Sequence, residues 1–147
     1  MFIVSTNDDS TMELKLIRDL ILRSVDALII APCNGIPALK PVLDETPIPV
    51  VWVDRIGDEF ADFVGVDNYM EASMLIKRFS VKPKKVGILH PKRSDVMTIQ
   101  LRIDGTKSAC EKQKIPFESA QLSENQEESV ESIKHLIDNG VDSFVAL

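Results

Sequence analysis

Short apolar runs alternate with longer amphipathic stretches along the whole chain. The short runs are rich in Val, Ile and Leu, which is typical of strands buried in a sheet. The strands expected from them cover residues 2–5, 27–31, 50–53, 63–66, 86–89, 117–122 and 143–147. The run at 117–122 alternates apolar with polar residues, so we expect it near a sheet edge.

The amphipathic stretches carry apolar residues three and four positions apart, which is the spacing of one helix face. The helices expected from them cover residues 10–23, 36–43, 68–79, 99–110 and 123–140. Ser10 with Glu13, and Ser123 with Gln126, have the spacing of a capping box at a helix start. We therefore expect the first and last helices to begin at these serines.

Strands that alternate with helices in this way predict parallel sheets covered by helices on both faces, which is an α/β architecture. The basic segment 80–85 contains Pro83 and interrupts the succession. It divides the chain into two expected lobes, residues 1–80 and residues 81–147.

Composition narrows the class of protein. An apolar content of 44% with 5% aromatic residues suits an aliphatic core. The net charge of −6 argues against nonspecific binding of nucleic acid, which needs clustered Lys and Arg. No apolar run approaches the roughly 20 residues that span a bilayer, and the first residues lack the basic flank of a secretion signal. We expect a soluble, cytoplasmic protein.

The two cysteines, Cys33 and Cys110, are far apart and neither belongs to a C-x-x-C unit. This spacing gives no support to a structural zinc site or a redox pair. Free, buried thiols are the expected state of both, which suits a reducing compartment.

Polar pairs follow two of the expected strands directly. Asp54-Arg55 comes after residues 50–53, and Asp67-Asn68 comes after residues 63–66. Ligands of parallel α/β sheets lie beyond the carboxyl ends of the strands, where such residues point into a crevice. A carboxylate and a guanidinium together could hold the hydroxyls or carboxylate of a ligand. A surface turn held by an ion pair remains the alternative for Asp54-Arg55.

Arg102 is a further candidate because it lies beside Ile99 and Ile103 on a partly apolar helix face. A buried guanidinium without a partner is costly, so we expect an anion or a carboxylate next to it. Trp52 lies inside a strand, where core packing is favoured over stacking on a sugar ring. His90 ends the strand at 86–89, and Ser94 follows in the next loop.

Catalytic motifs are missing from the sequence. It contains no G-x-S-x-G elbow, no phosphate-binding glycine loop and no H-E-x-x-H pair. We therefore expect no enzyme activity, no cofactor and no metal.

Several segments occur in an order that resembles one family. They read VDALIIAP, IPVVWVDR, VGVDN, KKVGIL and LRIDG. Together they resemble the effector-binding core of LacI/GalR-type transcription regulators, and the periplasmic sugar-binding proteins share that two-lobed fold. The resemblance implies two Rossmann-like lobes with parallel sheets, of the periplasmic-binding-protein-like type I.

The resemblance also implies a ligand and its contacts. A sugar or another small metabolite would lie between the lobes, in contact with Asp54 and Arg55 from the first lobe and Arg102 from the second. Four secondary candidates for ligand contact are His90, Ser94, Thr98 and Asn68. The Asp67-Asn68 pair matches a motif that more often organises the crossover between lobes. The resemblance further implies a cytoplasmic homodimer that binds operator DNA only through a helix-turn-helix absent from this chain.

The sequence departs from the family pattern in several places. Lys82-Pro83 replaces the usual Gly-His, and Glu71 replaces a usual Gly. The family's first strand and helix would precede Phe2, and the rest of its second lobe would follow Leu147. We therefore expect an incomplete fold, truncated at both ends. The missing strand leaves a gap in its sheet, and an open sheet edge invites pairing with another copy.

Four functions remain open at this point. The leading one is an effector-sensing domain of a LacI-type regulator, and the main alternative is the sugar-binding protein of an ABC transporter. A small α/β hydrolase or nucleotide enzyme using Asp54 or Asp67 is a third. The fourth is a fragment that binds nothing because too few cleft residues remain.

Overall fold

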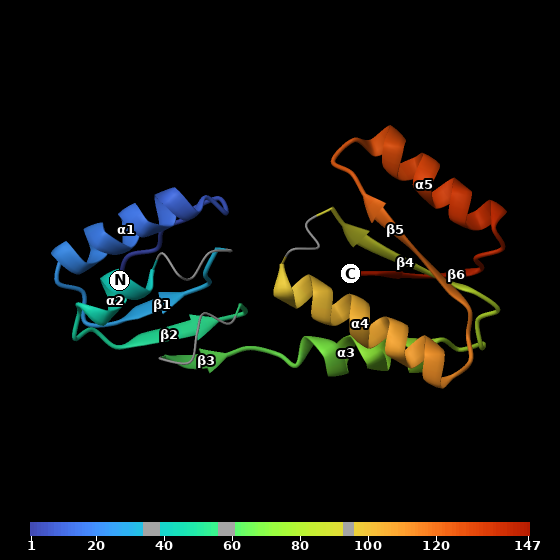
Figure 1. The fold of residues 1–147 in the computed structure, drawn as a ribbon, viewed down its shortest axis with the longest axis horizontal. Helices are drawn as coiled ribbons and strands as arrows, with labels where there is room; N and C mark the ends of the chain where they lie inside the picture. Colours follow the sequence, from blue (N-terminus) through green and yellow to red (C-terminus); the bar gives the residue numbers. More distant parts are fainter. Residues whose placement is uncertain (34–38, 56–60, 93–95) are drawn as a thin grey trace. The chain divides into compact units, whose positions relative to one another are not determined.

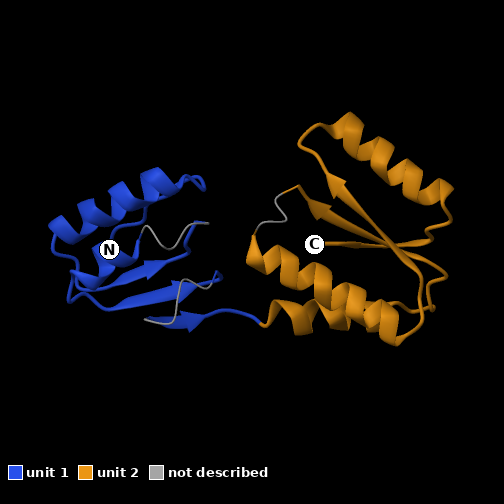
Figure 2. Ribbon diagram, viewed as in Figure 1, with its two compact units in different colours: residues 1–66 blue, residues 67–147 orange. Residues whose placement is uncertain are grey.

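The computed structural model describes residues 1–33, 39–55, 61–92 and 96–147. The chain forms two compact units, Met1–Val66 and Asp67–Leu147 (Figure 2). The division falls ahead of the boundary at 80/81 that the basic segment suggests. The helix that follows Asp67 belongs to the second unit, whereas the sequence places it at the end of the first lobe.

Unit 1 contains a parallel sheet of three strands in the order β1-β2-β3 (Figure 1). The strands are β1 (Leu28–Ile30), β2 (Val50–Val53) and β3 (Asp62–Val64), and the helices are α1 (Ser10–Leu22) and α2 (Lys40–Asp44). β1 and β2 begin and end within two residues of the bounds expected from their apolar runs. Where a helix is expected at 36–43, the structure has α2 beginning at Lys40 after its N-cap Leu39, and residues 36–38 lie outside the described residues.

One face of this sheet carries the core of unit 1. Alternate residues of β1 and β2 pack against Ile17 of α1 and Leu43 of α2. Trp52, at the centre of that face, is 0% exposed, which confirms its expected place in the core. The opposite face is open at Ile29, which is 76% exposed. The expectation of helices on both faces is therefore wrong for the described part of unit 1.

The start of the chain differs from its expected strand. Residues 2–5 form no strand, and the side chains of Met1–Val4 are exposed. A strand exists only where a neighbour completes its ladder of backbone hydrogen bonds, and the described sheet of unit 1 consists of β1, β2 and β3 without residues 2–5. High β-propensity alone therefore does not make Phe2–Ser5 a strand.

Unit 2 contains a second parallel sheet, in the order β5-β4-β6. Its strands are β4 (Val86–Pro91), β5 (Phe117–Leu122) and β6 (Ser143–Ala146). Its helices are α3 (Asn68–Leu75), the short 3-10 helix η2 (Ile76–Arg78), α4 (Met97–Lys112) and α5 (Gln126–Asp138). β5 lies at an edge, as its alternating pattern predicts.

Both faces of the second sheet are covered. Val86 and Ile88 of β4 pack with Ile76 and Cys110 from the α3–η2 and α4 side. Leu89 packs on the other face with residues of α5 and the turn after it. Successive side chains of β4 point to opposite faces of the sheet, and both faces are buried. This explains why the sequence of the strand is an unbroken apolar run.

The helix starts differ from the expected capping boxes. Asp9, not Ser10, caps α1, and its carboxylate accepts hydrogen bonds from the N–H groups of Thr11 at 2.8 Å and Met12 at 3.0 Å. Asn125 caps α5 in place of Ser123. In both cases the cap is the residue directly before the first helical residue, and its side-chain oxygen accepts from free N–H groups of the first turn.

Cys33 and Cys110 are free and buried, as expected. Among the helices described, none combines the length and the apolar content needed to cross a bilayer.

Candidate functional site

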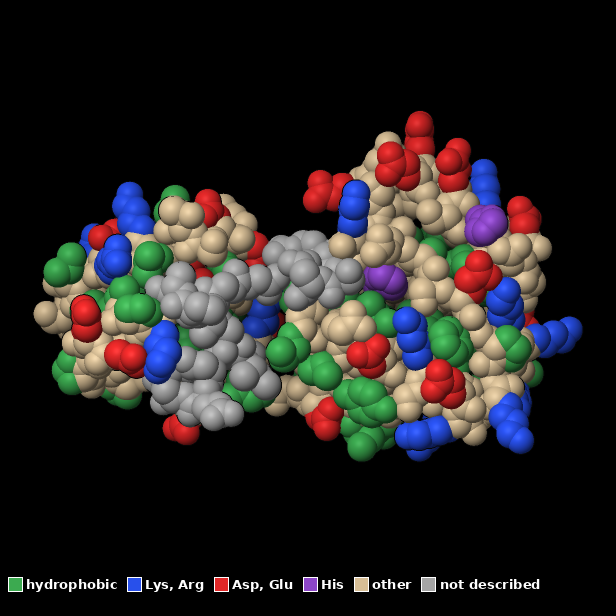
Figure 3. Space-filling model, in the orientation of Figure 1, with side chains coloured by type: hydrophobic (Ala, Val, Ile, Leu, Met, Phe, Trp, Pro, Cys, Tyr) green, Lys and Arg blue, Asp and Glu red, His purple; other side chains and the backbone are tan. Residues whose placement is uncertain are grey.

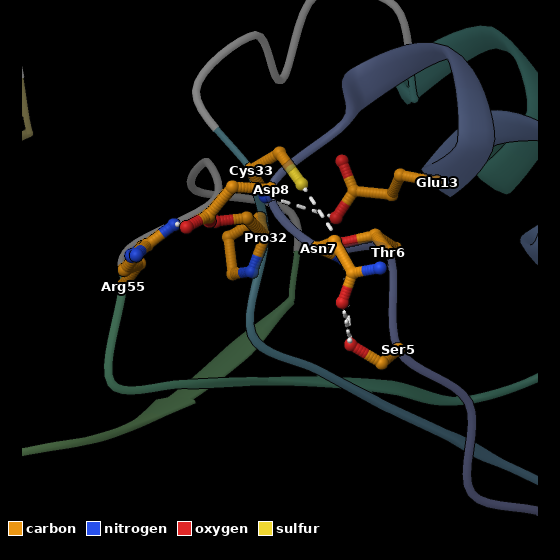
Figure 4. Close-up of polar contacts among 8 residues, drawn as sticks. All are labelled: Ser5, Thr6, Asn7, Asp8, Glu13, Pro32, Cys33 and Arg55. Carbon is orange, nitrogen blue, oxygen red and sulfur yellow. Dashed lines mark hydrogen bonds and ion pairs between the residues drawn. The ribbon is translucent and has the colours of Figure 1, made fainter.

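A polar cluster lies at the carboxyl edge of the sheet in unit 1 (Figure 4). Arg55 follows β2, and its Nη1 donates to Oδ1 of Asp8 at 2.7 Å and to the carbonyl oxygen of Pro32 at 3.3 Å. Asp8 precedes α1 and Pro32 follows β1, so three separate connections meet here. The ion pair with Asp8 raises the pKa of Arg55, which keeps the guanidinium charged.

Asp54 turns the chain at the end of β2. Its φ is +64°, a left-handed conformation in which Asp is more readily found than most residues with a side chain. Its N–H still donates to the carbonyl of Val64 at 3.1 Å, so the parallel ladder continues up to the turn. The carboxylate of Asp54 lies on an exposed residue while Arg55 is half-buried. The alternative expected from the sequence is a surface turn held by an ion pair within Asp54-Arg55. The structure instead pairs Arg55 with Asp8, which is distant in the sequence.

A buried layer supports the cluster from the α1 side. Glu13 is 3% exposed, and its Oε1 accepts a hydrogen bond from the N–H of Cys33 at 2.9 Å. The thiol of Cys33 lies 3.2 Å from the hydroxyl oxygen of Thr6. Burial raises the pKa of Glu13 and that of the Cys33 thiol. These contacts tie the loop before α1 to the end of β1.

Sequence reasoning missed this supporting layer. It assigned Glu13 to a capping box and took Cys33 only as a buried thiol. The sequence does contain an indication that Glu13 is buried, since Glu13 lies four residues before Ile17 on the apolar face of α1. A carboxylate on such a face needs a polar partner, and the loop after β1 supplies it.

A second pair of candidates meets in unit 2. Nε of Arg102 in α4 donates to Oδ1 of Asn68, the first residue of α3, at 2.7 Å. Asn68 is buried and Arg102 is half-buried. The partner found is a neutral amide, whereas the sequence predicts an anion or a carboxylate. Asp67 caps α3 by accepting from the N–H of Met70 at 2.9 Å, which fits an organising role for the Asp67-Asn68 pair.

Close packing of α3 on α4 makes this contact possible. A Cβ at Gly105 would overlap the backbone carbonyl of Tyr69. The absence of a side chain at Gly105 lets the two helices approach at the position next to Asn68. Arg102, one turn before Gly105, is thereby held against the start of α3.

The secondary candidates occupy different places. Thr98 is buried in the first turn of α4, and His90 is buried near the end of β4 with its Nδ1 3.1 Å from the carbonyl oxygen of Pro91. Ser94 lies outside the described residues. His135 is exposed on α5, as expected. Within the described ranges, no group of three or more His, Cys, Asp or Glu side chains is arranged to hold a metal ion.

Comparison with solved structures identifies the fold. The chain superimposes on a LacI transcriptional regulator from Lactobacillus brevis with a TM-score of 0.84 and 24% identity, over 99% of this chain and 56% of that one. The Cra transcriptional dual regulator from Pseudomonas putida, solved with fructose 1-phosphate, superimposes with a TM-score of 0.78 and 22% identity, over 99% of this chain and 56% of that one. An ABC transporter solute-binding protein from Mycobacterium smegmatis, solved with bound glycerol, superimposes with a TM-score of 0.75 and 22% identity, over 99% of this chain and 54% of that one. No family model and no curated protein matches the sequence.

These similarities confirm the expected α/β fold class, the periplasmic-binding-protein-like type I. The chain spans about half the length of the solved chains it matches. At this level of identity the likeness extends to the fold, and the ligands seen in those structures belong to those proteins.

Proposed function

We propose that this chain is the effector-sensing part of a LacI-type transcriptional regulator and that it binds a small metabolite, with a sugar as the leading class. The observation that carries the proposal is the polar cluster at the carboxyl edge of the unit 1 sheet. On this fold, that edge is where a ligand meets residues leaving the strands.

The geometry of Arg55 suits such a role. Both of its described contacts, to Asp8 and to Pro32, use Nη1. Nε and Nη2 are therefore the donors that a ligand would meet, and the carboxylate of Asp54 beside them would accept from hydroxyl groups. A donor fork next to an acceptor matches a polyhydroxylated molecule better than a purely anionic or purely apolar one.

Arg102 would contribute from unit 2. Its Nε is occupied by Asn68, so the side chain is oriented before any ligand arrives. We assign secondary roles in ligand contact to Asn68, Thr98, His90 and Ser94. Ligand binding would change the equilibrium between arrangements of the units because only a difference in affinity between them can transmit a signal.

The remaining parts of the proposal concern partners. The chain would work as a cytoplasmic homodimer, and a helix-turn-helix outside it would contact operator DNA. No catalytic step is required of any residue.

The test is a titration of the purified chain with sugars, sugar phosphates and purines, followed by melting temperature and calorimetry. Preferential binding to the folded state raises the melting temperature in a saturable way. Arg55→Ala and Arg102→Ala are each expected to weaken binding by roughly tenfold or more, since each removes a charged donor. Arg18→Ala and Arg78→Ala, at exposed positions in the same two units, are the matched controls.

Undiminished affinity in Arg102→Ala, with the fold intact by circular dichroism, would contradict its assignment. Absence of binding by every compound tested would contradict the sensing role of this chain.

The alternative is the binding protein of a sugar transporter, which the similarity to the Mycobacterium smegmatis protein keeps open. The ligand titration does not separate the two, because both would close on a sugar. A secretion signal encoded upstream of Met1 would favour the transporter, and a helix-turn-helix there would favour the regulator.

A further inference from the structure

One peptide group connects the buried layer of unit 1 to the polar cluster. It joins Pro32 to Cys33, and both of its polar ends are held by side chains. Its N–H donates to Oε1 of Glu13 at 2.9 Å, and its carbonyl oxygen accepts from Nη1 of Arg55 at 3.3 Å. A carboxylate of α1 and the guanidinium that follows β2 are therefore linked through a single peptide group.

This peptide group has little freedom to turn. Its atoms are coplanar, so the N–H and the C=O point to opposite sides and move together. The ring of Pro32 fixes φ, which leaves rotation about ψ of Pro32 as the motion that would swing the carbonyl. The hydrogen bond from the N–H of Cys33 to Glu13 opposes that rotation. The carboxylate on α1 therefore sets the direction of the carbonyl beside Arg55.

The same layer holds the second acceptor of Arg55. Asp8 accepts from Nη1 at 2.7 Å and lies in the loop before α1. The hydroxyl oxygen of Thr6, in that loop, lies 3.2 Å from Sγ of Cys33 (Figure 4). Because Glu13 holds Cys33 in place, it also restrains the loop that carries Asp8.

A buried carboxylate at this place is unfavourable for stability. Glu13 is 3% exposed and shares the buried face of α1 with Ile17, where an apolar residue would pack without losing hydration. Burial raises the pKa of Glu13, so its surroundings disfavour the charged form. Residues that reduce stability concentrate at functional sites, where they hold a geometry that function requires. The place of Glu13 beneath the polar cluster agrees with such a role.

We propose that Glu13 is a positioning residue of the effector site and that it orients the guanidinium of Arg55. It does so by fixing both acceptors of that group, the carbonyl of Pro32 directly and the carboxylate of Asp8 through Cys33. The consequence for effector binding rests on the proposed function, whereas the orientation of Arg55 is a property of the free chain.

Orientation matters because an arginine side chain has many rotamers. A guanidinium held at Nη1 by two acceptors presents its other donors in one direction before a ligand arrives. Without that hold, binding would have to immobilise the side chain, and the affinity would fall accordingly. Glu13 therefore contributes to the affinity for any ligand that Arg55 binds.

The orientation of Arg55 is measured on the chain without ligand. Nuclear magnetic resonance of the isotope-labelled guanidinium gives the rate of rotation about its Nε–Cζ bond, which hydrogen bonds at one Nη group slow down. Glu13→Leu keeps the bulk but removes the acceptor, and it is expected to speed this rotation at least about fivefold. Glu13→Gln keeps an oxygen that accepts from Cys33, so its rate should stay within about twofold of the wild type.

Three further observations complete the experiment. Glu45→Leu, at an exposed position of the same unit, should leave the rotation of Arg55 unchanged. Arg18, exposed on α1, should rotate at the same rate in every variant. Thr6→Val removes the hydroxyl beside Sγ of Cys33 and should speed the rotation of Arg55 at least about twofold. This variant decides the question if Glu13→Leu does not fold.

An Arg55 that rotates no faster in Glu13→Leu than in the wild type overturns the proposal. Equal rotation rates in Glu13→Leu and Glu13→Gln also overturn it, because the hydrogen bond to Cys33 would then have no part in the effect. If Glu13→Leu does not fold, an unchanged rate in Thr6→Val has the same meaning.

The consequence for binding is tested with the sugars, sugar phosphates and purines of the titration. For a compound that the wild type binds, Glu13→Leu should lower the affinity at least about fivefold, and Glu13→Gln should restore it. An equal loss of affinity in both variants contradicts the positioning role. If no compound binds, the proposed function fails, while the rotation rates still decide whether Glu13 orients Arg55. Figure 3 shows the charged side chains on one face of both units, among which the buried Glu13 has no place at the surface.

Discussion

Glu13 is a buried carboxylate, with 3% of its surface exposed, whereas most acidic side chains lie at the surface. It lies under the polar cluster, and its described hydrogen bond comes from the N–H of Cys33. Burial raises its pKa above the usual 4.5, while this hydrogen bond and the charge of Arg55 work in the opposite direction. The raised pKa shows that burial outweighs them.

The sign of the pH effect follows from this direction. A folded state with a raised carboxyl pKa holds the proton more tightly than the unfolded state does. The contribution to stability is complete below about pH 4.5 and is lost as the pH rises through the folded-state pKa. Glu13→Gln keeps an oxygen that can accept from Cys33 and has no proton to lose. It is expected to be more stable than the wild type at neutral pH, with the difference vanishing under acid conditions.

Urea unfolding at a series of pH values measures this effect. Glu45→Gln, an exposed carboxylate of the same unit, is the control and should show no such pH-dependent difference. A Glu13→Gln chain that is less stable than the wild type at neutral pH would mean that the ionised carboxylate stabilises the loop before α1.

At the scale of elements, the contact between α3 and α4 depends on Gly105. The neighbour that a side chain would meet there is the backbone of Tyr69, which cannot rotate away. The two helices would have to move apart, and this movement would weaken the hydrogen bond between Arg102 and Asn68.

Gly105→Ala is therefore expected to destabilise the chain although Ala favours a helix. Forcing a methyl group into a filled contact costs about 1–3 kcal/mol, and the gain in helix propensity is at most about 1 kcal/mol. Urea unfolding should show the net loss. Glu111→Ala, at an exposed position of α4, should change the free energy of unfolding by no more than about 0.5 kcal/mol. A Gly105→Ala chain of unchanged or increased stability would show that α3 can shift without cost.

Elements were predictable where local pattern and tertiary setting agree. β4 reads as a buried strand from its apolar run, and the structure buries it between helices on both faces. Residues 2–5 have the same local pattern but belong to neither of the two described sheets. Pairing is a property of the whole sheet, so no local pattern could reveal its absence.

At the scale of the whole molecule, the sequence placed candidate residues but not their partners. Asp54 and Arg55 follow β2 as expected from the end of an apolar run. The contact of Arg55 with Asp8 joins residues 47 positions apart, and that of Arg102 with Asn68 joins residues 34 apart. Such contacts depend on which connections the fold brings together at a sheet edge or between helices. Whether these residues bind a ligand stays a prediction.

The complete burial of Trp52 gives the two units distinct optical signatures. It is the one tryptophan of the sequence, and it lies in the core of unit 1. Its emission should shift to longer wavelength when that core opens to water and should not respond when only unit 2 unfolds. Far-ultraviolet circular dichroism, in contrast, follows the helices of both units. Denaturation curves recorded by the two signals will coincide if the units unfold together, and they will separate if one unit outlasts the other.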